Sequence, residues 1–407
     1  MRILHLSHGY PPAVGGSETV ICEFSERLVR RGHEVCVVTT TGYNTAAFRE
    51  PGRPTMSAGE EWREGVRVRR HRADPRVAPR LRRAQALAFR LRLPGNGALR
   101  TIYDGPLAPG MLRDAAHEPA DVIGATAFPL LHMQFAVAAA RARRVPSVLL
   151  GALHPDDRWG FDRAPIRRAI SHADAYVAYT PFERDHVERM GVAPERIHVI
   201  PPGVDAETVE GGDGAALREE VGVPAGVPLI GFVGQLGGHK GVDDLVASMR
   251  LVWKHEPDAF LLVAGATTPF LATIEKAVRQ LPAARRSRVR FLLDFDQARK
   301  RDVLAALDVF ASPSGYESFG LTFVEAWLAG LPVVGCRSGA VPTVVEHGED
   351  GVLVGYRAVP ELAGALIELL DDEPFRRRLA VTGRAKALER YTWEGSTGLL
   401  EALYAGV

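Results

Sequence analysis

The chain of 407 residues has little of what marks secreted, membrane-spanning or metal-binding proteins. Its three cysteines, Cys22, Cys36 and Cys336, stand singly in apolar surroundings, without disulfide or metal-ligand spacing. A reducing, cytoplasmic compartment is therefore expected. No run of about 18 apolar residues is present, which argues against a transmembrane helix. The apolar start is also too short for a signal peptide, so it is predicted to be a first strand.

Lysine is scarce too, because it supplies only 5 of the 50 basic residues. Residues 1–200 contain 29 arginines and 21 acidic residues, a net charge of +8, while the remainder carries 21 basic and 28 acidic residues, a net charge of −7. This asymmetry and the length both favour two domains. It also suggests that the first half meets an anionic partner, although an arginine-biased composition explains the same excess.

The beginning of the chain has the pattern of a doubly wound α/β sheet. A strand over 2–7 leads into a loop containing Gly15 and Gly16, and a helix is predicted with Ser17 as its N-cap and Glu18 in its first turn. A second strand is expected over 33–40. No G-x-G-x-x-G follows any predicted strand, which disfavours a nicotinamide oxidoreductase.

Residues 42–119 show the least regular pattern of the chain. Within them, the stretch 76–92 is rich in arginine, and Leu81, Ala84, Leu87, Ala88 and Leu91 fall on one face of a predicted helix. Such a helix suits an anionic acceptor or a membrane surface. In the second case the protein would lie peripherally at the inner face of the membrane. An ordinary surface helix with a basic outer side is the simpler explanation of the same pattern.

Alternating strand and helix patterns resume at residue 120 and begin again after a polar linker at 202–214. Strands are predicted over 121–125, 147–153, 175–179 and 197–201, and in the second half over 228–233, 259–264, 289–293, 309–312 and 352–354. His154 is expected at the end of the second of these. Two successive α/β domains follow from this alternation.

The most informative stretch is 312–334, which reads SPSGYESFGLTFVEAWLAGLPVV. Glu317 is predicted on a loop and Glu325 on the helix that follows. The first-turn N–H groups near Phe319–Leu321 would then face a ligand as an anion site. Two carboxylates beside an anion cradle suit a molecule that joins phosphates to hydroxyls. A core helix with two surface glutamates remains an equal alternative on spacing alone.

Five stretches in order resemble the retaining glycosyltransferases of family 4. They are YPPAVGGSE followed by LVRRGHEVCVVT, then RIHVIPPGVD, GFVGQLGGHKGVDDLV, LDVFASPSGYESFGLTFVEAWLAGLPVV and YTWE. The resemblance implies the GT-B fold, with two Rossmann-like domains facing across a cleft. It divides the chain into an acceptor domain, 1–203 with the returning helix 392–407, and a donor domain, 204–391.

The resemblance also implies roles for individual residues. Glu317 would face the donor sugar, Glu325 would bind ribose hydroxyls, and Lys240 would pair with the diphosphate. His154 would lie near the sugar and the acceptor. The full expected set is catalytic Glu317, His154 and Lys240, and donor-binding Gly15, Gly16, Gln235, Lys240, Ser318, Phe319, Gly320, Leu321, Thr322 and Glu325.

Three positions depart from the family pattern. Gln235 stands where an arginine is common, so one cation for the diphosphate is missing. Leu293–Asp294 replaces a usual glycine beside the base, and the loop 264–268 lacks its usual acidic residue. These departures leave open the base and the way in which the diphosphate is held.

The resemblance implies a hexosyltransferase that moves a hexose from a UDP- or GDP-linked sugar to an acceptor hydroxyl with retention of configuration. The acceptor would be a carbohydrate, a lipid-linked sugar or a small molecule, met by 42–119 and 154–163. No cofactor, nucleic acid or metal is expected, since the aspartates form only adjacent pairs such as 156–157 and 243–244, without a D-x-D motif in a suitable place. The alternatives are a catalytically silent nucleotide-binding or partner-supporting protein and a nucleotide-sugar epimerase.

Overall fold

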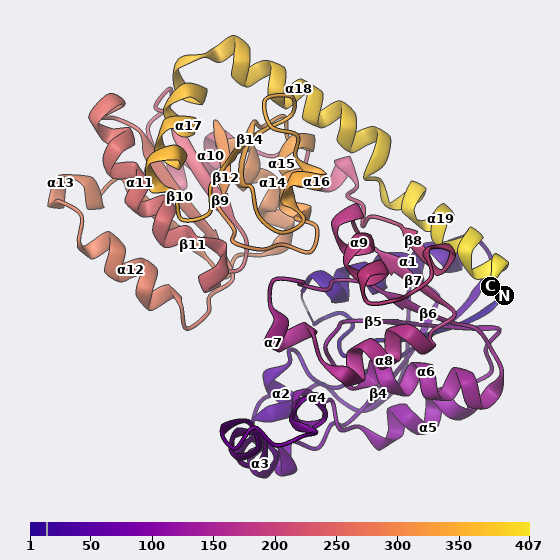
Figure 1. Ribbon diagram of the computed structural model, residues 1–407. Coiled ribbons are helices and arrows are strands. Elements are labelled where there is room, and N and C mark those ends of the chain that lie inside the picture. Colours follow the sequence, from indigo (N-terminus) through magenta and orange to yellow (C-terminus); the bar gives the residue numbers. More distant parts are fainter. Residues whose placement is uncertain (14) are drawn as a thin grey trace. The chain divides into compact units, whose positions relative to one another are not determined.

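The computed structural model describes residues 1–13 and 15–407, apart from the side chain of Arg158. The chain divides into two compact units (Figure 1). Unit 1 contains Met1–Pro201 and Trp393–Val407, and unit 2 contains Pro202–Thr392.

Unit 1 is built on an eight-stranded sheet in the order β3-β4-β2-β1-β5-β6-β7-β8. All neighbouring strands are parallel except β3 and β4. The strands are β1 (Arg2–Leu6), β2 (Glu34–Thr40), β3 (Gly59–Arg63), β4 (Val66–His71), β5 (Val122–Thr126), β6 (Ser147–Leu150), β7 (Ala175–Ala178) and β8 (Ile197–Val199). The central strands are apolar and buried on both faces, as a parallel sheet covered by helices requires.

Residues 42–119, which show the least regular sequence pattern, contain a β-hairpin that the pattern did not predict. β3 and β4 form a hairpin whose turn places Glu64 and Gly65 at positive φ, 46° and 77°. The alternation Val66, Arg67, Val68 puts the valines into the core and the arginines towards solvent. Because β4 continues the parallel sheet beside β2, the hairpin covers what would otherwise be an open sheet edge.

The helices of unit 1 are α1 (Gly16–Arg30), α2 (Ala46–Arg49), α3 (Ala78–Arg90), α4 (Asn96–Asp104), α5 (Pro109–His117), α6 (His132–Arg143), α7 (Arg158–Phe161), α8 (Ala164–His172), α9 (Pro181–Arg189) and α19 (Trp393–Gly406). α1 begins two residues earlier than predicted, because Gly15, not Ser17, is its N-cap. Glu18 lies in the first turn as predicted, but its side chain is buried.

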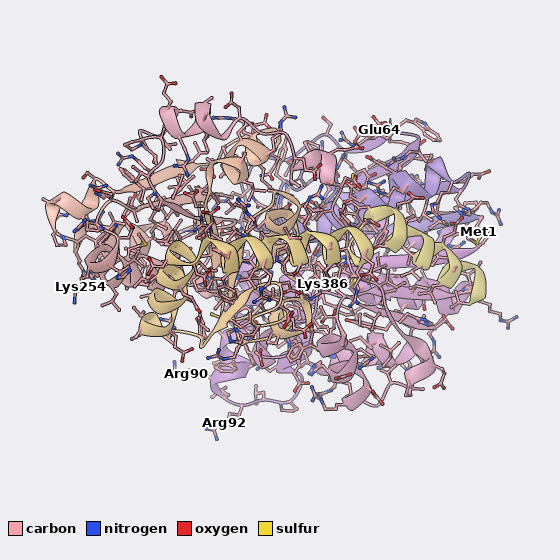
Figure 2. The ribbon with its side chains drawn as sticks, turned by 90° about the horizontal axis from the view of Figure 1, so that it is seen from above. Met1, Glu64, Arg90, Arg92, Lys254 and Lys386 are labelled. Atoms are coloured by element: carbon pink, nitrogen blue, oxygen red, sulfur yellow. The ribbon has the colours of Figure 1, made fainter. Side chains whose placement is uncertain are left out.

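α3 forms where a basic helix was predicted, but its apolar face differs from the prediction. Gln85 and Ala88 are buried, whereas Ala84 is exposed and Leu87 is 56% exposed. Just past the helix, Leu91 is 57% exposed. Figure 2 shows the side chains of Arg90 and Arg92 projecting outward here. The end of α3 therefore presents both apolar and cationic side chains to solvent.

Unit 2 is built on a six-stranded parallel sheet in the order β11-β10-β9-β12-β13-β14. The strands are β9 (Leu229–Val233), β10 (Phe260–Gly265), β11 (Val289–Leu293), β12 (Val309–Ser312), β13 (Val333–Cys336) and β14 (Val352–Val354). Its helices are α10 (Gly214–Glu220), α11 (Val242–His255), α12 (Leu271–Arg279), α13 (Ala283–Arg286), α14 (Lys300–Ala306), α15 (Leu321–Leu328), α16 (Val341–Val344), α17 (Val359–Asp371) and α18 (Glu373–Arg390).

The strand order of unit 2 is the doubly wound order 3-2-1-4-5-6, and unit 1 repeats it from β4 onwards. The predicted fold class, two Rossmann-like α/β sheets, is confirmed. In such sheets the order reverses at one point, and ligands bind outside the carboxyl ends of the strands there. These points lie between β1 and β5 in unit 1 and between β9 and β12 in unit 2. A helix with the length and hydrophobicity of a membrane span is absent from the part of the chain that the structure describes.

Candidate functional site

Two loops meet at the point where the strand order of unit 2 reverses. The loop after β9 contains Gly241, and the loop after β12 begins at Pro313. Gly241 has φ 67°, and a Cβ there would lie 2.3 Å from the carbonyl oxygen of Pro313. The backbone N–H of Gly315 donates to the carbonyl of His239 over 2.7 Å. The close approach therefore requires glycine, and it brings the predicted Lys240 and Glu317 together.

Lys240 and Glu317 form a tight ion pair at the meeting of these loops. The Lys240 Nζ lies 2.5 Å from the Glu317 Oε1, and both side chains are largely shielded from solvent. Burial works to raise the pKa of Glu317, but the charge and hydrogen bond of Lys240 and a hydrogen bond from Ser314 outweigh it. The pKa of Glu317 is therefore lowered, and the carboxylate is ionised at neutral pH.

The start of α15 has free backbone donors, as the sequence predicted. Gly320 is its N-cap at φ 94°, and a Cβ there would lie 2.7 Å from the Phe323 ring. Among the described residues, the N–H groups of Phe319, Gly320 and Leu321 have no hydrogen-bond acceptor. Phe319 itself is buried against the Tyr391 ring at 5.2 Å, which fixes the entry to the helix. Orphan donors and the helix dipole make this terminus suitable for an anion.

Glu325 lies one turn further along α15 and has a partner that sequence reasoning missed. The Nζ of Lys300 lies 2.8 Å from the Glu325 Oε1. Lys300 begins α14, 25 residues earlier in the chain, so no local spacing links it to Glu325. The one feature of the sequence that could have drawn attention to Lys300 is that the chain contains only five lysines. Ser318 and Thr322, also predicted to bind the donor, are half-buried beside this helix start.

The departures from the family pattern have local structural explanations. Asp294 has φ 49°, so it adopts the left-handed conformation that glycine commonly takes. Its carboxylate accepts hydrogen bonds from the backbone N–H and the hydroxyl of Thr267, both at 2.8 Å. The acidic group missing from the loop 264–268 is thus supplied by the loop after β11. Gln235 is exposed, and its side chain forms no hydrogen bond with the described residues.

Unit 1 has a second set of polar residues where its own strand order reverses. His8 and Glu18 are buried, with His8 Nε2 3.0 Å from Glu18 Oε1. A Cβ on Gly15 would lie 2.5 Å from Glu18 Oε2, so the glycine gives the carboxylate its space. At Gly16, by contrast, an added Cβ would meet open space. The net pKa of Glu18 is lowered, because the hydrogen bond and charge of His8 outweigh the raising effect of burial.

His154 does not end a strand, as was predicted, because β6 stops at Leu150. It lies in the following loop, after Ala152 at φ 78°, and its ring contacts the Phe161 ring at 5.0 Å. It is half-buried. β6 is shorter than predicted because the backbone leaves the extended conformation at Ala152, although the N–H of Gly151 still donates a hydrogen bond to the carbonyl of Val177 in β7.

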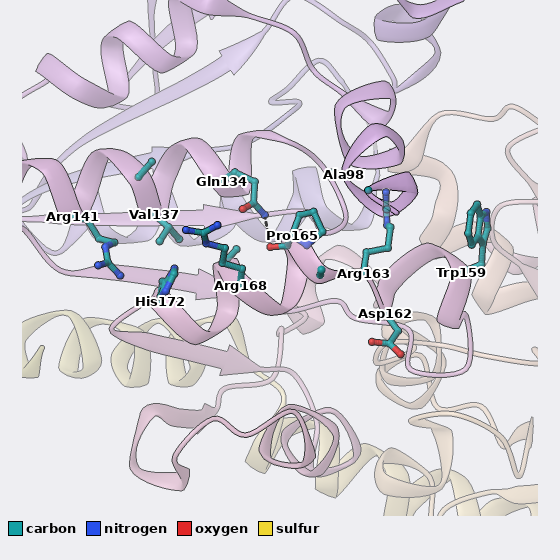
Figure 3. A pocket seen from close by; sticks show the side chains of 15 residues that line it. Ala98, Gln134, Val137, Arg141, Trp159, Asp162, Arg163, Pro165, Arg168 and His172 are labelled. Atoms are coloured by element: carbon teal, nitrogen blue, oxygen red, sulfur yellow. Dashed lines mark hydrogen bonds between the residues drawn. The ribbon is translucent and has the colours of Figure 1, made fainter. Parts of the chain in front are cut away.

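A hollow of about 890 Å³ lies on unit 1 (Figure 3). It is bordered by the start of α4, by Trp159 and Arg163, and by the facing sides of α6 and α8. Parts of the two segments predicted to meet an acceptor, 42–119 and 154–163, therefore line one depression. Arg163 is buried there and pairs with Asp104 at 2.9 Å. Figure 3 shows Trp159 at one end and Arg141 at the other.

The described residues contain no group of three or more His, Cys, Asp or Glu side chains placed to hold a metal ion. The absence of a metal requirement stays a prediction. Of the predicted site residues, unit 2 brings together Lys240 and Glu317 at the reversal point, with Phe319–Leu321 and Glu325 on the segment that follows.

Two protein-family models match the chain. Glycosyltransferase Family 4 matches residues 14–208, and Glycosyl transferases group 1 matches residues 214–386. Each match falls almost wholly within one of the two α/β sheets and its helices.

Curated relatives match more than half of the chain. The D-inositol 3-phosphate glycosyltransferase of Corynebacterium diphtheriae is 34% identical over 247 residues, which cover 58% of this chain and 57% of the relative. The alpha-maltose-1-phosphate synthase of Mycolicibacterium smegmatis is 35% identical over 242 residues, covering 56% and 62%. The chain therefore spans less than two thirds of the length of these relatives.

Solved structures share the fold over the full chain. HepE of Anabaena in complex with UDP-glucose has a TM-score of 0.75 at 19% identity, covering 100% of both chains. The sucrose-phosphate synthase of Thermosynechococcus elongatus has a TM-score of 0.73 at 19% identity, covering 100% of this chain and 98% of that one. From the two matched family models and this fold, the chain belongs to the glycosyltransferases of the family 4 type with the GT-B fold.

Proposed function

We propose that the protein transfers a hexose from a UDP- or GDP-linked sugar to an acceptor hydroxyl, with retention of configuration and without a metal ion. The observation that carries this proposal is the arrangement at the reversal point of unit 2. It combines the Lys240–Glu317 pair with the unsatisfied N–H groups of Phe319–Leu321. A nucleoside diphosphate needs cations and N–H donors, and a sugar needs fixed carboxylate acceptors.

The same residues suit the chemistry of the proposed transfer. When the glycosidic bond breaks, negative charge develops on the departing diphosphate. The ammonium of Lys240 and the start of α15 stabilise that charge, which is the task of a metal ion in other transferases. Loss of one well-placed donor typically costs ~3 kcal/mol of barrier stabilisation. Glu317 holds Lys240 in place before the donor arrives and accepts hydrogen bonds from sugar hydroxyls afterwards.

Retention is proposed to follow from attack on the face that the diphosphate leaves. The acceptor hydroxyl donates its proton to the departing phosphate oxygen, while the new bond to the anomeric carbon forms on that face. Glu317 as a covalent nucleophile is less favoured, because its lowered pKa and its pairing with Lys240 both reduce its reactivity. The roles of Gly15, Gly16, Gln235, Ser318, Thr322 and His154 stay predictions.

The hollow on unit 1 is the proposed place for part of the acceptor. Trp159 offers an aromatic face at one end, and Arg141 and Arg168 offer cations along the other. Neither arginine pairs with a carboxylate in the described part of the chain. Both curated relatives named above carry a phosphate in the name of their substrate or product. An anionic carbohydrate acceptor fits this surface.

Peripheral membrane contact through 76–92 is a further part of the proposal. Leu87 and Phe89 are exposed on α3, and Phe89 contacts the exposed Trp159 at 4.5 Å. In the described residues, the nearby Arg83, Arg90 and Arg92 form no ion pairs. Exposed aromatic and apolar side chains beside unpaired cations suit an anionic lipid surface.

The proposed activity is tested by proton NMR of UDP- and GDP-hexoses incubated with the protein in EDTA. Slow donor hydrolysis is expected, and the first sugar anomer released should keep the configuration of the donor. Lys240→Ala should abolish the reaction. A donor converted into its epimer would instead establish the epimerase alternative.

The catalytically silent alternative rests on Gln235, which leaves one expected cation absent. Under it, nucleotides bind, but no donor is consumed by the wild-type protein even with a panel of phosphorylated and lipid-linked acceptors. Release of the inverted anomer, or activity lost on adding EDTA and restored by a divalent cation, would contradict the proposed mechanism.

A further inference from the structure

Lysine is used selectively in this chain. Of 50 basic residues only five are lysines, and all five lie in unit 2. Two of them, Lys240 and Lys300, hold the two glutamates of the candidate donor site. Elsewhere arginine forms most of the ion pairs, for example Arg163 with Asp104 and Arg218 with Asp308. Apart from the pair of Lys386 with Asp350, the use of lysine at both glutamates therefore sets this site apart from the other ion pairs of the described residues.

The difference lies in how the two cations occupy a carboxylate. A guanidinium presents a planar fork that commonly binds both carboxylate oxygens at once. An ammonium is a point charge, and Lys300 is bonded to Oε1 of Glu325 at 2.8 Å. With about four acceptor positions on a carboxylate, the other oxygen of Glu325 keeps its capacity for hydroxyl donors.

The Lys300 contact also fixes the glutamate side chain. Glu325 is 13% exposed and Lys300 22% exposed, so the pair is shielded from solvent but reachable from it. A free glutamate loses rotamer freedom when a ligand immobilises it, and this loss of entropy weakens binding. Because Lys300 already holds the Glu325 side chain, less of this freedom is lost when a ligand binds.

We propose that Lys300 is a positioning residue that makes the site selective for ribonucleotides. It acts through Glu325, by holding one carboxylate oxygen and presenting the other to the ribose hydroxyls. This inference rests on the proposed nucleotide-sugar donor. It adds a role for Lys300 and a selectivity for the ribose of the nucleotide. Its consequence is a preference for UDP or GDP over the 2′-deoxy nucleotide, and this preference depends on Lys300.

Two other roles for Lys300 give different results. As a purely structural link between α14 and α15, it would affect every ligand of the site equally. As a direct diphosphate cation replacing the one absent at Gln235, it would also affect ribo- and deoxyribonucleotides equally. Only action through Glu325 on the ribose distinguishes the two sugars.

The experiment is a calorimetric titration of UDP, GDP and their 2′-deoxy forms into four proteins. These are the wild type, Lys300→Ala, Lys300→Arg and the control Lys276→Ala, which removes an exposed lysine of α12 with no ion pair in the described structure. Thermal melting of each variant verifies folding. The nucleotide pair that the wild type binds more tightly is used for the comparison.

Lys300→Ala should weaken ribonucleotide binding about tenfold, the range expected for loss of a charged hydrogen bond. Binding of the 2′-deoxy form should change less than about twofold, since its diol is incomplete. Lys300→Arg should also weaken the ribonucleotide, because its fork occupies both oxygens, and Lys276→Ala should match the wild type.

Equal losses for both sugars, no loss in Lys300→Ala, or full ribonucleotide affinity in Lys300→Arg would each overturn the inference while leaving the proposed donor intact. A folded wild type that binds no nucleotide would overturn the proposed function itself.

Discussion

At the scale of single residues, the Lys240–Glu317 pair controls the charge of the candidate site. Burial alone would raise the pKa of Glu317, and Lys240 reverses the direction. Because the folded pKa is below the unfolded value, this carboxylate stabilises the fold above about pH 4.5, and that contribution is lost as the pH falls below it.

Lys240→Ala should therefore raise the pKa of Glu317 above its ordinary value. The folded state would then bind a proton more readily than the unfolded state, and stability would fall as the pH rises towards neutrality. Urea unfolding at several pH values between 3 and 7 measures this change of slope. An unchanged slope in Lys240→Ala would show that the pair does not control the titration of Glu317.

Gly241 gives a second residue-scale prediction. Its φ of 67° and the 2.3 Å approach of the Pro313 carbonyl leave no room for a side chain. Gly241→Ala should destabilise unit 2 by about 1–3 kcal/mol, from the strained conformation and the displaced loop. It should also weaken nucleotide binding. Gly364→Ala is a suitable control in denaturant unfolding, because no atom lies within 4 Å of that Cβ position.

How far a residue was predictable depended on whether its partner was local. Gly320 and the free N–H groups of α15 followed from the order of residues along one segment. Lys300 did not, because its contact with Glu325 is set by how α14 and α15 pack. Asp294 replaces a glycine only because its own backbone takes a left-handed conformation, which the sequence does not specify.

At the scale of elements, the returning helix α19 belongs to unit 1. Trp393 is buried and meets the Phe24 ring edge-on at 5.4 Å. Arg31 contacts Glu394 and Glu401, each at 2.5 Å. At the far end of the helix, the Tyr404 hydroxyl lies 2.9 Å from Nε2 of the buried His5. The helix completes the core that a chain ending before it would leave open.

Trp393→Ala should accordingly destabilise unit 1 by about 3–5 kcal/mol, the usual cost of removing a buried aromatic side chain. Leu399→Ala, on the exposed side of the same helix, should change stability by less than about 0.5 kcal/mol. Equal effects of the two substitutions in denaturant unfolding would contradict the placement of α19.

The elements also show where the sequence pattern was insufficient. Strands buried on both faces, such as β9 and β12, form uninterrupted apolar runs and were predicted within a residue. The β3–β4 hairpin was missed because charged residues fill its solvent-facing positions and β3 is exposed throughout. In α3 the helix was predicted, but its buried side was not, because residues outside the helix decide which face is covered.

At the scale of the whole molecule, unit 1 should be sensitive to mild acid. Burial lowers the pKa values of His5 and His132 to about 3, while both would titrate near 6.5 when unfolded. The unfolded state therefore binds more protons between these values, and stability falls with falling pH below about 6.5. Each histidine contributes a slope of about 1.4 kcal/mol per pH unit.

His5→Gln should reduce that slope, whatever its effect on stability at neutral pH. The comparison is urea unfolding of wild type and variant between pH 4 and 7, followed by hydrogen exchange to separate unit 1 from unit 2. The exposed His172→Gln is the matched control. An identical pH slope in wild type and His5→Gln would contradict a neutral buried imidazole.

We propose that unit 2 holds a nucleotide-sugar donor through Glu325, Lys240 and the start of α15. Calorimetric titration of UDP- and GDP-sugars in EDTA, with wild type and Glu325→Ala, tests it most directly. We expect one nucleotide class to bind the wild type without metal, and Glu325→Ala to bind it at least tenfold more weakly, as loss of a charged acceptor requires. No binding to a folded wild type, or equal affinity in Glu325→Ala, would contradict the proposed donor site.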